Sequence, residues 1–184
     1  MQILMISGTY NAQSKTHAVL SEAKRICDAF GVGAEIAELC DFDITSGQKD
    51  TRHDLATLIG KIEAADAVII ATPNYQGSMS GLLKVAIDHI PEHGLRHKAV
   101  GLISVSGGMG RMSQPISHLR DVVAALEGLA VSTAIACHGG DFEKDDAGQS
   151  RLTTPKLLAR VRTLVEEIYA YVELVDIARQ RGLA

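Results

Sequence analysis

Hydrophobic residues along this chain gather in short unbroken runs, separated by longer segments with a different spacing. Four runs are rich in Val, Ile and Leu: residues 3–6, 67–71, 100–105 and 131–136. Unbroken apolar runs of this length are typical of strands that are buried on both faces of a sheet. Residues 35–39 alternate polar and apolar side chains instead, which predicts an edge strand with one solvated face.

Between the runs, apolar residues recur three and four positions apart, which is the spacing of an amphipathic helix. The stripes are Val19, Ala23, Ile26 and Phe30; Leu55, Leu58 and Ile62; Leu82, Val85, Ala86 and Ile90; and Ile116, Leu119, Val122, Val123 and Leu126. A longer last helix is expected to begin at Pro155, after Thr154 as its N-cap, with a stripe from Leu157 to Val175. Strands that alternate with helices predict a doubly wound α/β fold with five parallel strands.

Composition narrows the class of protein. The 184 residues are 46% hydrophobic and 22% charged, no linker-like stretch divides them, and we expect residues 1–184 to form a single domain. A net charge of −4, the absence of tryptophan and the lack of a basic stripe disfavour a nucleic-acid partner. No run of about 18 apolar residues is present, so we expect no membrane partner.

The cysteines and the first residues of the chain indicate the cellular compartment in which the protein is expected. Cys27, Cys40 and Cys137 form no Cys-x-x-Cys pair, and we expect them to be reduced and to act as small core residues. The first four residues lack the charge and the apolar run of an export signal. We therefore expect a cytoplasmic protein.

In a doubly wound sheet, ligands bind beyond the carboxyl ends of the strands, so three loops matter. The first, residues 7–16, is rich in hydroxyl groups and opens a helix near Ser14. Free amides at a helix start and the hydroxyls of Thr9, Ser14 and Thr16 suit a phosphate group, although an ordinary Ser/Thr helix cap would read the same way. The loop matches neither a Walker motif nor a three-glycine dinucleotide fingerprint.

The second loop follows the strand at 67–71. Pro73 stiffens the turn, Tyr75 can lie against a flat ring, and Gly77 lets the backbone approach a ligand closely. Amides of residues 74–78 could then bond to heteroatoms of that ring. A plain turn with an exposed tyrosine is the alternative.

The third loop, residues 104–111, has three glycines in four positions, which leaves backbone amides with no side chains in front of them. It could grip the polar edge of a flat heterocycle, or it could be a flexible connector. Taken together, the three loops describe a site for a phosphorylated flat ring, and FMN is the best candidate on chemistry.

Three motifs in these loops resemble the NAD(P)H-dependent FMN reductase family. They are residues 8–16, similar to the family's phosphate loop; Thr72, Pro73, Tyr75, Gly77, Ser78, Gly81, Leu83 and Lys84, similar to its ring-facing signature; and Ser106, Gly107 and Gly108. The resemblance implies a flavodoxin-like three-layer α/β/α sandwich with strand order 2-1-3-4-5. It also implies FMN, NADPH or NADH, and hydride transfer from the nicotinamide to flavin N5 and on to free flavin or another acceptor.

The cofactor-binding residues that we predict are Thr9, Asn11, Ser14, Lys15, Thr16, Pro73, Asn74, Tyr75, Gln76, Gly77, Ser78, Ser106, Gly107 and Gly108. We predict no catalytic side chain, because the flavin carries the chemistry. Asn11 stands where most members of the family have arginine, so FMN could be held more loosely here. Lys15 could instead supply the missing charge from the next turn.

The resemblance further implies a homodimer or homotetramer, and a flavin-dependent monooxygenase as a possible recipient of reduced flavin. A quinone, azo or chromate reductase with tightly bound FMN and a flavodoxin-type electron carrier are the alternatives. Pro91 and Gly94 interrupt the helix that would align His89, His93 and His97, so we predict no metal site. Residues 141–146 lack the spacing of a calcium loop and are expected to form a solvated turn.

Overall fold

The computed structural model describes residues 1–44, 49–109 and 113–183. Within these ranges, five parallel strands form one sheet in the order β2-β1-β3-β4-β5. Their bounds are Gln2–Ser7 (β1), Gly33–Glu38 (β2), Ala67–Pro73 (β3), Ala99–Ser106 (β4) and Leu129–His138 (β5). The predicted flavodoxin-like order is confirmed. Ser7, Ala71 and Ile103 are register partners across β1, β3 and β4, so the loops that follow these strands leave one edge of the sheet.

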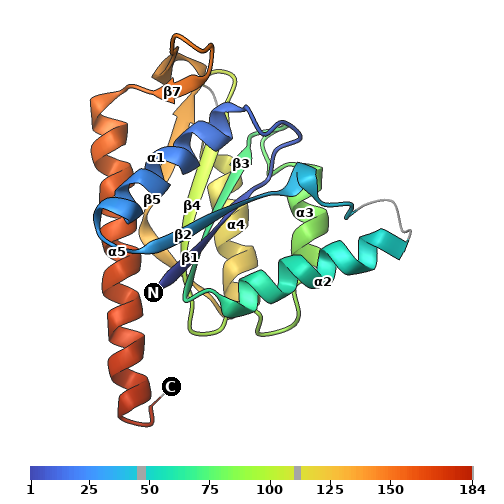
Figure 1. The fold of residues 1–184 in the computed structure, drawn as a ribbon, viewed down its shortest axis with the longest axis vertical. Coiled ribbons are helices and arrows are strands. Elements are labelled where there is room, and N and C mark those ends of the chain that lie inside the picture. The colour runs from blue at the N-terminus through green and yellow to red at the C-terminus, as the bar shows by residue number, and fades with distance from the viewer. Residues whose placement is uncertain (45–48, 110–112, 184) are drawn as a thin grey trace.

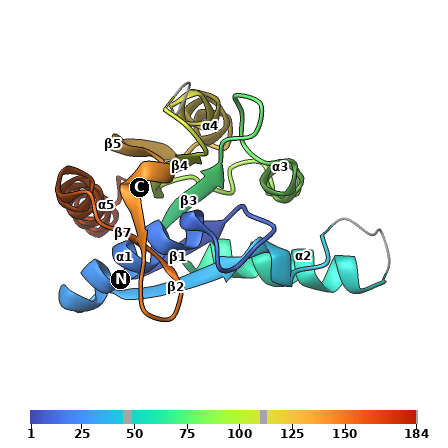
Figure 2. The same cartoon turned by 90° about the horizontal axis from the view of Figure 1, so that it is seen from above.

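Helices cover both faces of this sheet (Figures 1 and 2). Their bounds are Lys15–Ala29 (α1), Lys49–Ala64 (α2), Gly81–Asp88 (α3), Gln114–Ala125 (α4) and Pro155–Gln180 (α5). Side chains such as Met5 and Ile69 pack against α1 and α5, whereas Leu4 and Ile70 pack against α2, α3 and α4. Successive residues of a buried strand thus supply two separate cores, which explains why the strands lack polar alternation.

The last strand differs from the prediction. β5 alternates along its length, with Leu129 45% exposed while Val131 and Ile135 are buried. Its place at the end of the sheet order makes it an edge strand, so the expectation that residues 131–136 are buried on both faces is wrong. Small alanines in this run look apolar in sequence yet tolerate partial exposure. Arg120 donates to the Val131 and Ser132 carbonyl oxygens at 3.0 Å each, which blocks part of that edge.

A short antiparallel hairpin, absent from the prediction, follows β5. A 3-10 turn at Gly139–Asp141 (η2) leads into Phe142–Lys144 (β6) and Ser150–Leu152 (β7), and this hairpin lies beside α1. A similar turn, Leu39–Asp41 (η1), follows β2. Part of the segment predicted as a solvated turn is therefore a strand. Strands of three residues, with two exposed charged side chains in β6, have no periodicity from which they could be recognised.

The last helix begins at the residue that the sequence predicts. Thr154 is the N-cap of α5 and Pro155 its first residue, but the Thr154 hydroxyl makes no capping bond to the helix. It donates instead to Asp141 Oδ1 at 2.8 Å. The side chain therefore joins α5 to the turn after β5.

The cysteines carry free thiols. Cys27 and Cys137 are buried, and burial raises their pKa values to about 11 and about 12 respectively, whereas Cys40 is half-buried. Both buried thiols act as small core residues, as expected. In the part of the chain that the structure describes, no helix has the length and apolar character needed to cross a bilayer.

Candidate functional site

The three loops predicted as a site are joined to one another by hydrogen bonds. The Gly8 amide donates to the Ala71 carbonyl at 2.8 Å, and the Ser80 hydroxyl donates to the Gly8 carbonyl at 2.5 Å. The Asn74 amide donates to the Val105 carbonyl at 2.8 Å. The loop after β3 therefore contacts both the loop after β1 and the end of β4.

Within residues 9–16, the loop is organised by its own side chains. The Thr9 hydroxyl accepts from the Asn11 amide at 3.3 Å, and Asn11 Oδ1 accepts from the Gln13 amide at 2.9 Å. Ser14 is the N-cap of α1 and accepts from the His17 amide at 3.1 Å. Since these hydroxyls act as acceptors, their O–H groups can still donate to an anion.

The start of α1 also offers backbone donors. The amides of Lys15 and Thr16, at the first two helical positions, have no acceptor among the described residues, and the Thr16 side chain is buried under the loop. Together with the partial positive charge of a helix N-terminus, this arrangement suits a phosphate. Residues 7–16 contain no arginine, and Asn11 Oδ1, at the position where the family has one, is engaged in the turn.

Lys15 points away from the centre of its own loop. Its ammonium lies 6.0 Å from the centroid of the Phe142 ring. A Cβ atom placed on Gly139 would lie 3.2 Å from Lys15 Nζ and 3.1 Å from the Gly107 carbonyl oxygen. The Lys15 charge is therefore located where the loops after β4 and β5 meet.

The loop after β3 closes in a tight turn. Tyr75 and Ser78 exchange backbone hydrogen bonds at 3.0 Å, with positive φ angles of 53° at Gln76 and 83° at Gly77. Two positive φ angles define a type I′ turn, in which glycine at the second position avoids strain. Asn74 Oδ1 accepts from the Gly77 amide at 2.9 Å and braces the turn. Pro73 ends β3, and the Tyr75 ring is 51% exposed at the tip.

The loop after β4 presents open backbone. Ser106, the last residue of β4, is buried, whereas Gly107 and Gly108 are exposed and a Cβ atom on either would meet nothing within 4 Å. A flat ligand could therefore approach these amides without steric hindrance. Residues 110 and 111, the end of the predicted loop 104–111, lie outside the described residues.

A fourth segment, the turn after β5, completes this rim. The Asp141 carboxylate accepts from the His138 amide at 2.8 Å and from the Thr154 hydroxyl at 2.8 Å. Desolvation alone would raise the pKa of Asp141, but these two bonds and the nearby His138 hold the pKa of this carboxyl below its ordinary value. The ionised carboxylate thus fixes the turn that carries Gly139.

Several contacts at this rim were missed from sequence. Ser78 Oγ lies 3.0 Å from His118 Nδ1, and a Cβ atom on Gly77 would lie 2.4 Å from Gln114 Oε1. His118 and Gln114 are four residues apart on α4, so one face of that helix supports the tip of the loop after β3. Ser80 was also missed, although a serine directly before an apolar helical segment is an N-cap signal.

The fold and these loops together define a class of protein. A flavodoxin-like sheet carries a phosphate-type helix start, an exposed tyrosine and open glycine amides at the ends of β1, β3 and β4. Among the described residues, no group of three His, Cys, Asp or Glu side chains could hold a metal ion. The class is that of proteins that bind a phosphorylated flat cofactor.

Comparisons with known proteins agree with this class. A family model described as NADPH-dependent FMN reductase matches residues 1–141. An FMN-dependent NADPH-azoreductase of Staphylococcus aureus strain USA300 is 37% identical over 180 residues, which cover 94% of this chain and 95% of the relative. The chain belongs to the NADPH-dependent FMN reductase family, and it is an oxidoreductase that uses FMN and NADPH.

Solved structures support the fold. An apo NADH:FMN oxidoreductase has a TM-score of 0.75 at 19% identity, over 93% of this chain and 88% of that one. The flavoenzyme FerB, an NAD(P)H:acceptor oxidoreductase from Paracoccus denitrificans, has a TM-score of 0.72 at 20% identity, covering 94% and 97%. A flavodoxin of Streptococcus pneumoniae has a TM-score of 0.63 at 12% identity, covering 92% and 97%.

Proposed function

We propose that this protein holds FMN across the loops after β1, β3 and β4, and that it reduces flat organic acceptors of the azo or quinone type with NADPH. The observation that carries the proposal is the hydrogen bond from Ser80 to the Gly8 carbonyl, which ties the phosphate-type loop to the tyrosine-bearing loop. The acceptor class is taken from the azoreductase relative. FMN supplies the ring that accepts a hydride and passes two electrons on.

The residues present fit the phosphate end of FMN. Hydroxyls of Thr9 and Ser14 and the amides of Lys15 and Thr16 supply donors with no competing acceptor among the described residues. Lys15 adds positive charge nearby but points toward Gly107. We therefore expect moderate rather than very tight binding, since a charge-assisted contact from arginine, generally worth about 1.5–3 kcal/mol, is missing at Asn11.

The residues around the ring orient it rather than react with it. Tyr75 offers an exposed aromatic face, and Gly107 and Gly108 offer unobstructed amides. The amides of residues 74, 75, 77 and 78 already donate to protein acceptors, which differs from the expectation that the amides of 74–78 bond to the ring. Ser78, Asn74, Pro73 and Ser106 set the positions of these groups. No side-chain acid or base is assigned, because positioning is the protein's contribution.

Steady-state kinetics test the proposal. Purified protein with FMN should consume NADPH when an azo dye or a quinone is added, and parallel double-reciprocal plots would mark FMN that stays bound during turnover. Converging plots with FMN as the varied substrate would mark free flavin as the acceptor. Binding of FMN without any consumption of NADPH or NADH would overturn the proposal and favour a flavodoxin-type electron carrier.

We propose a homodimer in solution, in which α5 contributes to the interface. Tyr169, Leu174 and Ile177 on this helix are 43%, 62% and 44% exposed, and Figure 1 shows α5 running beyond the end of the sheet. Exposed apolar side chains gathered on one element favour association. Light scattering would show a dimer, and Leu174→Glu would shift it toward the monomer.

Two finer expectations belong to the same proposal. A cytoplasmic location is consistent with the unpaired thiols and with the use of NADPH. If the kinetics show that reduced FMN leaves, a flavin-dependent monooxygenase is the class of partner that would consume it. Co-purification with a monooxygenase, or its stimulation in a coupled assay, would support this partner.

A further inference from the structure

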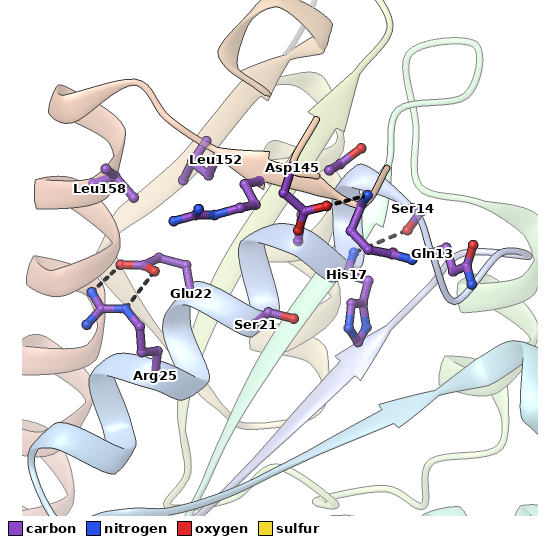
Figure 3. A pocket seen from close by; sticks show the side chains of 13 residues that line it. Gln13, Ser14, His17, Ser21, Glu22, Arg25, Asp145, Leu152 and Leu158 are labelled. Atoms are coloured by element: carbon purple, nitrogen blue, oxygen red, sulfur yellow. Dashed lines mark hydrogen bonds and ion pairs between the residues drawn. The ribbon is translucent and has the colours of Figure 1, made fainter. Parts of the chain in front are cut away.

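A cavity of about 540 Å³ lies between α1 and the β6–β7 hairpin, outside the three loops described above. It begins at Gln13 and Ser14 of the phosphate loop and follows α1 past Ser21 to Glu22 and Arg25, as Figure 3 shows. The hairpin side is formed by Asp145, Gln149, Arg151 and Leu152. This volume is in the range of small-molecule and cofactor sites.

Among the described residues that line the cavity, one cationic side chain has no partner. Arg25 is paired with Glu22 through two hydrogen bonds of 2.9 and 2.7 Å. Asp145 Oδ1 accepts from the Ala147 and Gln149 amides at 3.0 and 2.8 Å, so its charge is engaged by the hairpin turn. The Arg151 side chain has no ion pair or hydrogen bond to any residue that the structure describes, and its register partner in the antiparallel β6–β7 pair is Glu143. The Arg151 guanidinium is therefore available to pair with an anion in the cavity.

The remaining surface suits a purine nucleoside. Leu152 is buried and Leu158 is half-buried, and both line the cavity, so they form an apolar wall next to the polar one. The Ser21 hydroxyl and the side-chain amide of Gln149 belong to residues that line the same space. A flat base, a ribose with hydroxyl groups and a phosphate would each meet a suitable surface.

The cavity begins beside Lys15, whose ammonium lies at the loops after β4 and β5. Ser14 lines it, and the next residue, Lys15, places its ammonium beside Gly107 and Gly139. A dinucleotide that spans both regions would pass this ammonium with its pyrophosphate. Arg25 and Arg151 lie beyond the phosphate loop, so a ligand at the far end need not displace the FMN phosphate.

We propose that this cavity binds the adenosine 2′-phosphate end of NADPH, with Arg151 pairing with the 2′-phosphate. The inference rests on the proposed function, because it places the nicotinamide of the same molecule over the ring-facing loops. Arginine binds phosphate in a bidentate, charge-assisted manner, and an arginine near the ribose is a known way to prefer NADPH over NADH. Arg151 is thus a specificity-determining residue of the cosubstrate site.

Calorimetric titration of the full chain with adenosine 2′,5′-bisphosphate tests this directly. FMN is kept saturating, so that the bisphosphate cannot occupy the phosphate loop, and 5′-AMP is titrated in parallel. The wild type should bind the bisphosphate at least about tenfold more tightly than 5′-AMP, the factor expected for one charge-assisted contact. Arg151→Ala should bring the two affinities together.

Lys144→Ala is the matched control. Lys144 is exposed on β6 of the same hairpin and does not line the cavity, so this variant should bind the bisphosphate as the wild type does. Equal loss in Lys144→Ala and Arg151→Ala would mean that only general surface charge attracts the ligand, which overturns the proposal. So would equal affinity of the wild type for the bisphosphate and 5′-AMP.

Two further measurements test the site independently. One uses a variant whose side chain fills the cavity, and the other compares kcat/KM for NADPH and NADH. Ser21→Phe should abolish bisphosphate binding in a protein whose circular dichroism and FMN affinity match the wild type, and retained bisphosphate binding would contradict the proposed location. In Arg151→Ala the ratio of kcat/KM for NADPH to that for NADH should fall about tenfold. A wild type that oxidises neither nucleotide would refute the proposed function, while the titration would still decide the site.

Discussion

The loop after β1 and the loop after β3 are held in place in different ways. Residues 9–16 are organised by hydrogen bonds between residues two or three positions apart, such as Asn11 with Gln13 and Ser14 with His17. The loop after β3 depends on distant partners, because Ser80 bonds to Gly8 and Ser78 lies against His118. Residues 9–16 can therefore take their shape from α1 alone, whereas the tight turn at Tyr75–Ser78, although closed by its own bonds, takes its position from the sheet and α4.

The difference has a consequence for function. A loop held by local bonds offers donors as soon as its helix forms, which suits the capture of a phosphate. A loop held by distant bonds takes its position from the strands and helices around it, which suits the placement of a ring relative to a second substrate. Changes in the distant contacts should therefore cost the most.

The largest effect is expected at Ser80. Its buried hydroxyl caps α3 by accepting from the Leu83 amide at 3.1 Å and donates to the Gly8 carbonyl, so Ser80→Ala removes a cap and a link between loops. We expect a loss of about 1–3 kcal/mol in the free energy of unfolding and weaker FMN binding. Urea denaturation and FMN fluorescence titration measure the two quantities.

Ser113→Ala supplies the control for this change. Ser113 is the N-cap residue of α4, but its side chain makes no capping hydrogen bond and is exposed. Its replacement should change the free energy of unfolding by less than about 0.5 kcal/mol. Similar losses in the two variants would show that neither the capping bond of Ser80 nor its bond to Gly8 contributes to the free energy of unfolding.

The same contrast explains how much of the site could be predicted. The local loop was accessible from sequence, because the Ser14 cap and the hydroxyl groups lie within one short segment. In the loop after β3, Tyr75 and Gly77 marked the turn, but nothing in the sequence indicated that Gln114 and His118 of a later helix would support it. Contacts between distant segments depend on the rotation of each helix, and no periodic pattern encodes that for exposed polar residues.

The fold shows a similar division. Runs such as 67–71 and 100–105 gave β3 and β4 to within a few residues, because burial on both faces leaves no room for polar side chains. β5 was read as fully buried, although its alanines are only partly covered at the edge. The β6–β7 hairpin was missed because it is fixed by Asp145 and its contact with α1 rather than by any pattern.

A smaller effect is expected in the local loop. Ser14→Ala removes a hydroxyl that we assign to the FMN phosphate, so FMN affinity should fall about tenfold, or about 1.4 kcal/mol. Riboflavin has no phosphate and serves as the internal control, because loss of the α1 cap would affect both ligands. Fluorescence titrations with each flavin give the comparison. Equal weakening of both would remove Ser14 from the phosphate site and leave it as a helix cap only.

The smallest effect concerns pH, at the turn after β5, which one local and one distant hydrogen bond hold in place. Asp141 bonds to His138 and Thr154, and its pKa is lowered in the folded protein. A lowered folded pKa stabilises the protein above the unfolded pKa of about 3.9, and this stabilisation is lost as the pH falls through the folded pKa. Asp141→Asn should therefore be less stable than the wild type near neutral pH, and the difference should shrink in acid.

Chemical denaturation at several pH values measures this difference in the free energy of unfolding, and Asp146→Asn, at an exposed neighbour, is the control. A gap between wild type and Asp141→Asn that stays constant down to the acid limit would mean that the carboxylate charge does not hold this turn, and that its hydrogen bonds alone tie Gly139 to the rim.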